Sequence, residues 1–181
     1  RILSELQVLE SKLDVLVNNA GATWGASLEE FPEKGWDKVT SLNLKTPFFL
    51  IQKFLPMLKV GATPDDPSRI INIGSVDGIR VPIWDNYSYA ASKAGLHHLS
   101  KTLVRPLAEQ NININTIAPG PFSTDMMAPM KEGGWSDTVT SAVPLNRFGE
   151  AGDIVVTAIF LASPASSYIT GATIPVDGGM S

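Results

Sequence analysis

The stretch "LDVLVNN", Leu13–Asn19, reads as a buried β-strand that ends in turn-forming residues. Three similar runs follow it: "RIINIGS" (69–75), "NININTIAPG" (111–120) and "ATIPVDGG" (172–179). Helical periodicity fills the intervals between them, over Trp36–Lys59, Tyr89–Glu109 and Asp153–Leu161. Strands that alternate with helices need crossover connections, which predicts a parallel sheet covered on both faces. We therefore expect a doubly wound α/β fold.

Composition narrows the class of protein. The 181 residues are 44% hydrophobic and 18% charged, which predicts one compact soluble domain. A net charge of -4 with scattered basic residues argues against nucleic acid as a partner. The longest apolar run, "PFFLIQKFLPML" (47–58), is too short and interrupted to span a membrane. Zero cysteines fit a reducing compartment, so we expect a cytoplasmic protein.

The first residues, "RILSELQVLESK" (1–12), already follow a helical register without a capping residue before them. We expect that the chain begins inside a helix and that an upstream segment precedes it.

Ligands of doubly wound sheets bind beyond the carboxyl ends of the strands. The residues that follow the first three strands are Asn18–Gly21, Gly74–Ser75 and Pro119–Gly120. Small and turn-forming residues at these points let a ligand approach the backbone closely. The sequence therefore predicts a binding crevice lined by these three segments.

The helix that begins near "DNYSYAASKAG" (85–95) carries two tyrosines and one lysine. Tyr89 and Lys93 are four residues apart and share a helix face, whereas Tyr87 points elsewhere. A phenol has an ordinary pKa near ~10, and a desolvated ammonium beside it would lower that pKa. We expect Tyr89 to be an acid–base group and Tyr87 to pack or to line the site. The alternative is an amphipathic helix with an ordinary surface lysine.

Asn43 stands four residues before Pro47. Proline has no N–H, so the carbonyl of Asn43 should lose its helical partner at a kink. A free carbonyl at such a kink can hold a water molecule. The alternative is a kinked helix that only packs.

These motifs together are similar to those of the short-chain dehydrogenase/reductase family. The resemblance covers the whole chain and rests on "NNAG" (18–21), Asn43, Ser75, "YAASK" (89–93), "APGPFSTDM" (118–126) and "PVDGG" (175–179). It implies a Rossmann-type fold and hydride transfer between a nicotinamide dinucleotide and a carbonyl or alcohol. Tyr89 would be the general acid, Lys93 would lower its pKa and hold the ribose, and Ser75 would bind the substrate oxygen. Asn43 would position a relay water.

The resemblance also implies a cofactor site. Its residues would be Asn18, Ala20, Gly21, Tyr89, Lys93, Pro119, Gly120, Phe122 and Thr124. The family's glycine-rich turn does not occur in these residues, so residues 1–181 should be a partial domain that lacks the N-terminal βαβαβ. We expect NADP as the cofactor, with NAD as the alternative. No metal is expected, and His97 and His98 should be interface or surface residues.

The substrate side should be apolar. The segment 121–139 follows the third strand and should overhang the substrate, which Ser75, Trp84, Met126, Met127 and Met130 would contact. The stretches "NNAGATWG", "INIGSVDGIRVP" and "LHHLSK" resemble the rhamnolipid-type branch of 3-oxoacyl-(acyl carrier protein) reductases. That branch implies NADPH, a 3-oxoacyl thioester and an acidic carrier protein. Basic residues that could dock the carrier protein are Arg80, Arg105, Lys131 and Arg147.

Two alternatives remain open, and Lys93 disfavours a third, a cofactor-free lyase or dehalogenase. The same machinery would serve a sugar or steroid-like alcohol dehydrogenase, and the fold would also serve a catalytically silent scaffold protein. A cofactor-free lyase would carry arginine in place of Lys93. In the family, helices at 36–59 and 88–109 form the subunit interface, so we expect a homo-oligomer, a dimer or tetramer. Pro106 should bend the second of these helices or end it early.

Overall fold

The computed structural model describes residues 2–124 and 134–181. Its centre is a four-stranded parallel sheet in the order β1-β2-β3-β4. The strands are β1 (Val15–Asn18), β2 (Ser68–Ile73), β3 (Ile112–Pro119) and β4 (Thr173–Val176). All four lie where the sequence predicts them, with shorter bounds. Leu16 is in register with Ile70, which is in register with Ile114.

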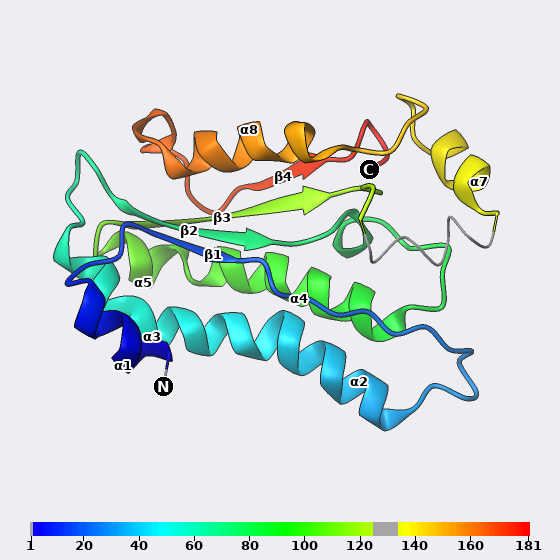
Figure 1. Ribbon diagram of the computed structural model, residues 1–181, viewed down its shortest axis with the longest axis horizontal. Helices are drawn as coiled ribbons and strands as arrows, with labels where there is room; N and C mark the ends of the chain where they lie inside the picture. The colour runs from blue at the N-terminus through cyan, green and yellow to red at the C-terminus, as the bar shows by residue number, and fades with distance from the viewer. Residues whose placement is uncertain (1, 125–133) are drawn as a thin grey trace.

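Helices cover both faces of this sheet, as Figure 1 shows. The elements α2 (Glu33–Thr40), α3 (Thr46–Val60), α4 (Tyr87–Thr102) and α5 (Val104–Ala108) lie on one face, and α8 (Ala151–Ala162) lies on the other. The remaining helical elements are α1 (Ile2–Leu9), α7 (Ser136–Ser141) and the short turns η1 (Ser41–Lys45), η2 (Val76–Gly78) and η4 (Pro164–Ser166). The doubly wound α/β prediction is confirmed.

Alternate residues of each strand supply the two halves of the core. Ile70 of β2 and Ile114 of β3 pack with Phe54 and Leu58 of α3. Their neighbours Ile71 and Ile117 pack instead with Leu161 of α8. Successive side chains of a strand point to opposite faces, so a nearly continuous isoleucine run fills both layers.

The face toward α4 becomes polar near the carboxyl ends of the strands. The Asn18 Nδ2 donates to Asn72 Oδ1 (2.7 Å), and Asn72 Nδ2 donates to Ser100 Oγ (2.9 Å). Thr116 Oγ1 also donates to Ser100 Oγ (2.9 Å). This buried network joins three strands to one helix. It therefore holds α4 in register with the edge at which the crevice is expected.

Two helices depart from simple α geometry at prolines. The helix 36–59 of the sequence prediction is interrupted by the π-helical turn η1, directly before Pro47. The helix 89–109 is interrupted at Leu103, so α4 ends at Thr102 and α5 carries Pro106. Proline cannot donate the backbone bond four residues back, which explains the second interruption as predicted. Over residues 2–124 and 134–181, no helix is long and apolar enough to cross a membrane.

Candidate active site

Ser75 follows β2 at the carboxyl edge of the sheet. Its backbone is extended, and its Oγ accepts the N–H of Asp77 (3.1 Å) as the cap of the 3₁₀ turn η2. The side chain is buried, and it lies near enough to Tyr89 to lower the pKa of that phenol. The turn thus aims the serine hydroxyl at the helix α4.

Tyr89 and Lys93 lie one turn apart on α4 and meet on the same face, as their spacing predicts. The Lys93 Nζ lies 5.5 Å from the centroid of the Tyr89 ring. It donates to the carbonyl of Ile73 (2.7 Å), the last residue of β2. The hydroxyl of Tyr87 donates instead to the Asp85 carboxylate (2.8 Å). Ser75, Tyr89 and Lys93 therefore form one cluster, and Tyr87 lies outside it.

Burial dominates the electrostatics of this cluster. Burial raises the pKa of Tyr89, the hydrogen bond with Ser75 lowers it, and the charge of Asp77 raises it further, for a net increase. Lys93 is not among the groups that shift the Tyr89 pKa, so its expected lowering of that pKa stays a prediction. Burial also lowers the pKa of Lys93, from 10.5 to about 8. Desolvation disfavours the charged forms of both groups.

His97 is a site residue that the sequence interpretation misplaced. It is only 7% exposed, so the expectation of an interface or surface residue is wrong for it, although His98 is exposed. The backbone N–H of Ser75 donates to His97 Nε2 (3.3 Å), and His97 is also hydrogen-bonded to the backbone of Gly78. Burial first, then the charges of Lys93 and Lys101, lowers its pKa to about 4, so the ring is neutral near pH 7.

The glycines around Ser75 make room for this ring. A Cβ built at Gly74 would collide with His97 Nε2, and one built at Gly78 would lie 2.8 Å from His97 Cε1. Gly74 and Gly78, on either side of Ser75, are therefore the feature of the sequence that indicates a bulky side chain packed against this turn. His97 therefore supports the backbone of the turn that carries Ser75.

Asn43 is buried in η1 and binds the segment after β1. Its Oδ1 accepts the N–H of Ala22 (2.9 Å), and its Nδ2 donates to the carbonyl of Ala22 (2.9 Å) and to Ser92 Oγ (3.1 Å). The predicted break in the helix is present as the π-helical turn. The relay water on the Asn43 carbonyl stays a prediction.

The segment after β1 lies against the cluster. A Cβ at Gly21 would lie 3.5 Å from Asn43 Oδ1 and 3.8 Å from Lys93 Nζ, so the glycine leaves the lysine open on that side. Asn18 is buried, and its Oδ1 has no hydrogen-bond partner among the described residues. The Lys93 ammonium has three N–H donors, and one of them is used by Ile73. Because Gly21 has no side chain next to this ammonium, a polar ligand such as a dinucleotide ribose could reach it. Ala20 belongs to the same segment.

The other expected cofactor residues follow β3. Pro119 ends that strand, and the N–H of Gly120 donates to Val176 (3.0 Å). A Cβ at Gly120 would lie 2.8 Å from Asp177, so only glycine fits between the ends of β3 and β4. Thr124 donates its N–H to the carbonyl of Phe122 (2.9 Å). These residues reach the same edge of the sheet as Ser75.

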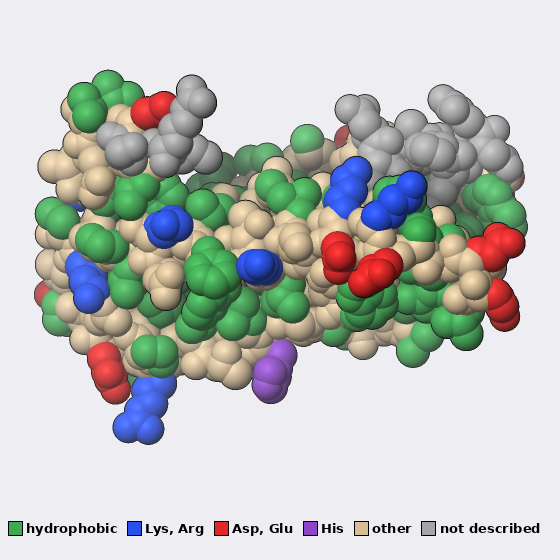
Figure 2. Space-filling view, turned by 90° about the horizontal axis from the view of Figure 1, so that it is seen from below, with side chains coloured by type: hydrophobic (Ala, Val, Ile, Leu, Met, Phe, Trp, Pro, Cys, Tyr) green, Lys and Arg blue, Asp and Glu red, His purple; other side chains and the backbone are tan. Residues whose placement is uncertain are grey.

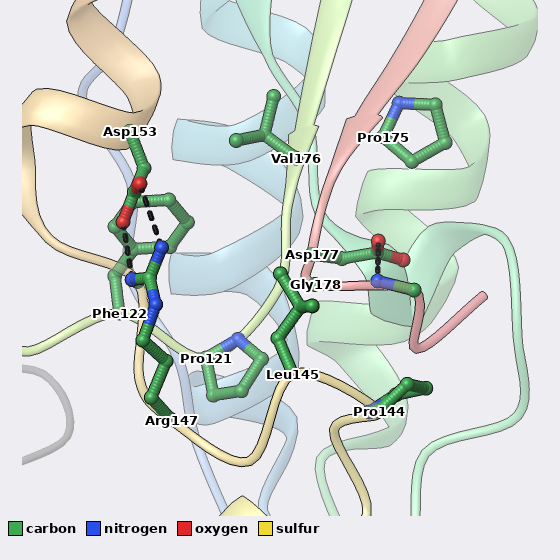
Figure 3. Close-up of a pocket in the computed structure, with 12 residues that line it drawn as sticks. Pro121, Phe122, Pro144, Leu145, Arg147, Asp153, Pro175, Val176, Asp177 and Gly178 are labelled. Atoms are coloured by element: carbon green, nitrogen blue, oxygen red, sulfur yellow. Dashed lines mark hydrogen bonds and ion pairs between the residues drawn. The ribbon is translucent and has the colours of Figure 1, made fainter.

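A cavity of about 530 Å³ opens beside Phe122, between the end of β4 and the start of α8 (Figure 3). Its charged side chains already bind one another or the backbone. Arg147 forms two bonds to Asp153 (2.6 and 2.9 Å), and Asp177 accepts the N–H groups of Gly179 and Ser181. Ser75, Tyr89 and Lys93 do not line this cavity. We therefore place the chemistry at the serine–tyrosine–lysine cluster.

Trp84 stands between η2 and α4, and its ring packs edge-on against Trp135, with centroids 5.5 Å apart. The pair joins the loop before Tyr89 to the segment before α7. Met126, Met127 and Met130 lie outside the described residues, so their expected substrate contacts stay predictions.

The fold and this cluster define the class of protein: a Rossmann-type α/β domain with a serine–tyrosine–lysine site at the carboxyl edge of its sheet. Comparisons with known proteins agree. A family model described as "Enoyl-(Acyl carrier protein) reductase" matches residues 2–181. The chain therefore belongs to the short-chain dehydrogenase/reductase family.

Two curated relatives are similar over most of this chain. A rhamnolipids biosynthesis 3-oxoacyl-[acyl-carrier-protein] reductase of Pseudomonas aeruginosa is 43% identical over 180 residues, which cover 99% of this chain and 70% of the relative. A 2-dehydro-3-deoxy-D-gluconate 5-dehydrogenase of Dickeya dadantii is 40% identical over 174 residues, which cover 93% and 65%.

A solved structure extends the comparison to three dimensions. The Pseudomonas aeruginosa RhlG/NADP active-site complex superposes with a TM-score of 0.95 at 42% identity, and the match covers 99% of this chain and 71% of that one.

Proposed function

We propose that this protein reduces the ketone of 3-oxoacyl thioesters with NADPH. The observation that carries the proposal is the cluster of three side chains: Ser75 shifts the pKa of Tyr89, and the buried Lys93 Nζ lies 5.5 Å from the Tyr89 ring centroid. A reductase relative that is 43% identical and a structural neighbour in complex with NADP support the substrate class and the cofactor. When bound, NADPH supplies the hydride that reduces the carbonyl carbon.

The residues of the chain supply the proton and the orientation. Ser75 donates a hydrogen bond to the carbonyl oxygen, and Tyr89 donates the proton to that oxygen. The raised pKa of Tyr89 keeps the phenol protonated at neutral pH, which suits reduction. Lys93, beside Gly21 and Asn43, would hold the ribose and return a proton to Tyr89.

The second candidate is oxidation or reduction of a sugar acid, which the 40% identical gluconate-type dehydrogenase supports. Assays of the full-length protein with NADPH and a short-to-long series of 3-oxoacyl thioesters, beside a keto sugar acid, separate the two. An inactive series with an active sugar acid would reverse our order of preference.

For the thioester series, kcat/KM should rise with acyl chain length, since each buried methylene adds up to ~0.8 kcal/mol until the pocket is filled. Trp84→Ala should reduce this gain, because Trp84 packs against Trp135 in the loop that leads to Tyr89 and supplies apolar surface there. Trp36→Ala is the matched control, because Trp36 lines a separate groove with Phe31 and Tyr87. If only the Trp36 variant flattened the series, the acyl chain would lie in that groove instead.

The His97 contact makes a second prediction. Gln at position 97 can place an oxygen where Nε2 accepts the Ser75 N–H, whereas Asn is too short to do so. We expect His97→Asn to lower kcat by about 10-fold, the equivalent of one lost hydrogen bond, and His97→Gln to recover most of it. Thermal unfolding of both variants separates positioning from stability. Equal losses of kcat in the two variants would contradict the role of His97 in positioning Ser75.

We further propose a homo-oligomer and, for the thioester, an acyl carrier protein as partner. Exposed apolar side chains on α8, Val156 and Ile159 among them, support the first. On the face drawn in Figure 2, basic side chains are scattered among apolar and acidic ones. An acidic carrier protein would therefore contact separate basic residues rather than one basic patch. Its affinity, measured at low and at high salt, should fall only moderately as salt rises.

A further inference from the structure

Asp77 places a carboxylate beside the catalytic pair. Its backbone N–H donates to Ser75 Oγ (3.1 Å), and its Oδ2 accepts from Asn86 Nδ2 (3.0 Å). Asn86 is buried and directly precedes α4, whose first turn carries Tyr89. The carboxylate is thus held between the Ser75 turn and the N-terminus of α4. A negative charge is favourable next to a helix N-terminus.

The geometry limits how far this charge lies from the reacting atoms. Four covalent bonds separate the nitrogen of Asp77 from its carboxylate oxygens, so these oxygens lie within roughly 8 Å of the Ser75 hydroxyl. That separation does not exceed the Debye length at physiological salt, which is about 8 Å. The charge of Asp77 also contributes to the raised pKa of Tyr89, so its field reaches the phenol.

Two positive charges, those of Arg80 and Lys93, also lie near these groups. Arg80 and the Asn86 bond oppose the effect of burial, which raises the pKa of Asp77. Arg80 is not among the groups that shift Tyr89, whereas Asp77 is. The Lys93 Nζ lies 5.5 Å from the Tyr89 ring centroid and donates to the carbonyl of Ile73, so replacing Asp77 changes the field at the site while this ammonium stays in place.

We propose that Asp77 is a specificity-determining residue that selects ketones with uncharged neighbouring groups and disfavours keto acids. The inference rests on the proposed reductase function. The substrate oxygen must lie within hydrogen-bond distance of Ser75 and Tyr89, and the Asp77 carboxylate lies within roughly 8 Å of the same Ser75 hydroxyl, so a substrate carboxylate one or two carbons from the ketone is exposed to its charge. Like charges so placed repel, whereas an ester or thioester has no charge to repel. The residue would thereby separate acyl thioesters from sugar acids.

A pair of small substrates tests this directly in the full-length protein. Acetoacetate and ethyl acetoacetate present the same ketone, and only the first is charged at pH 7. Each takes a hydride from NADPH at the carbonyl carbon and a proton at the oxygen, which gives the 3-hydroxy product. We expect wild type to prefer the ester, and Asp77→Asn to reduce the ratio of kcat/KM values on the order of tenfold.

Asp85→Asn is the matched control. It removes the same charge from the same loop, but Asp85 is exposed and its carboxylate binds Tyr87, outside the catalytic cluster. The ester-to-acid ratio of this variant should equal that of wild type.

Three results would overturn the proposal: a wild type that prefers acetoacetate, an Asp77→Asn ratio equal to wild type, or an equal change in the Asp85 variant. A wild type that reduces neither these ketones nor the thioesters would instead reject the reductase function, and the inference with it.

Discussion

Tyr89→Phe is expected to lower kcat for ketone reduction by about 10²- to 10⁴-fold, with the Kd for NADPH nearly unchanged. The phenylalanine ring can keep the place of the tyrosine over Lys93, but it has no proton to give and no hydroxyl for Ser75. A loss confined to kcat is the signature of a group that acts in the transition state. Steady-state kinetics and fluorescence titration of NADPH measure the two quantities.

Tyr87→Phe is the control for this experiment. The Tyr87 hydroxyl binds an exposed carboxylate, and its ring packs against Phe31. Removing the hydroxyl should change kcat by about twofold at most, as for other surface changes. If Tyr87→Phe were the more damaging substitution, the general acid would have been assigned to the wrong tyrosine.

The sequence predicts the fold well because its signals are local. The isoleucines of β2 and β3 fill both core layers, which is why these strands appear as apolar runs rather than as an alternating pattern. The spacing of Tyr89 and Lys93 likewise follows from helix geometry alone. Pro106 marks the end of α4 for the same reason, since a missing N–H is a local property.

Properties that depend on contacts between distant segments were not predictable. His97 looks like half of a surface pair, and only its packing against Gly74 and Gly78 shows that it supports Ser75. The role that we propose for Asp77 cannot be predicted from its neighbours in the sequence, because it depends on the hydrogen bond from Asn86, nine residues further on. The direction of the Tyr89 pKa depends on whether burial or charge dominates, and sequence spacing gives neither the depth nor the distance.

The second large effect is expected from Lys93→Met, which should abolish reduction and yet stabilise the fold. Lys93 is 4% exposed, and its pKa of about 8 lies well below the ordinary value of 10.5. That difference corresponds to roughly 3 kcal/mol of unfavourable burial of the charge at pH 7. Methionine has a similar length and no charge, so the variant loses only the hydrogen bond to Ile73. We expect a net gain on the order of 1 kcal/mol at pH 7.

This gain should depend on pH in a defined direction. Between pH 8 and 10.5 the unfolded chain keeps the lysine protonated while the folded protein releases the proton. Where the unfolded state binds more protons, stability rises with pH, so wild type recovers part of the burial cost in this window. The difference in the free energy of unfolding between Lys93→Met and wild type should therefore fall by roughly 2 kcal/mol from pH 7 to pH 10, so the gain of about 1 kcal/mol becomes a loss of about 1 kcal/mol.

Urea unfolding at both pH values and one fixed protein concentration measures this difference, and fixed concentration matters because assembly would shift the midpoint. Lys101→Met is the matched control, since Lys101 lies on α4 with an exposed side chain. Its effect on the free energy of unfolding should be small and alike at both pH values. A Lys93 variant that is less stable than wild type at pH 7 would mean that the Ile73 contact outweighs the cost of burying the charge. The lysine would then support the fold as well as the chemistry, and its buried charge would no longer be a stability cost that serves function.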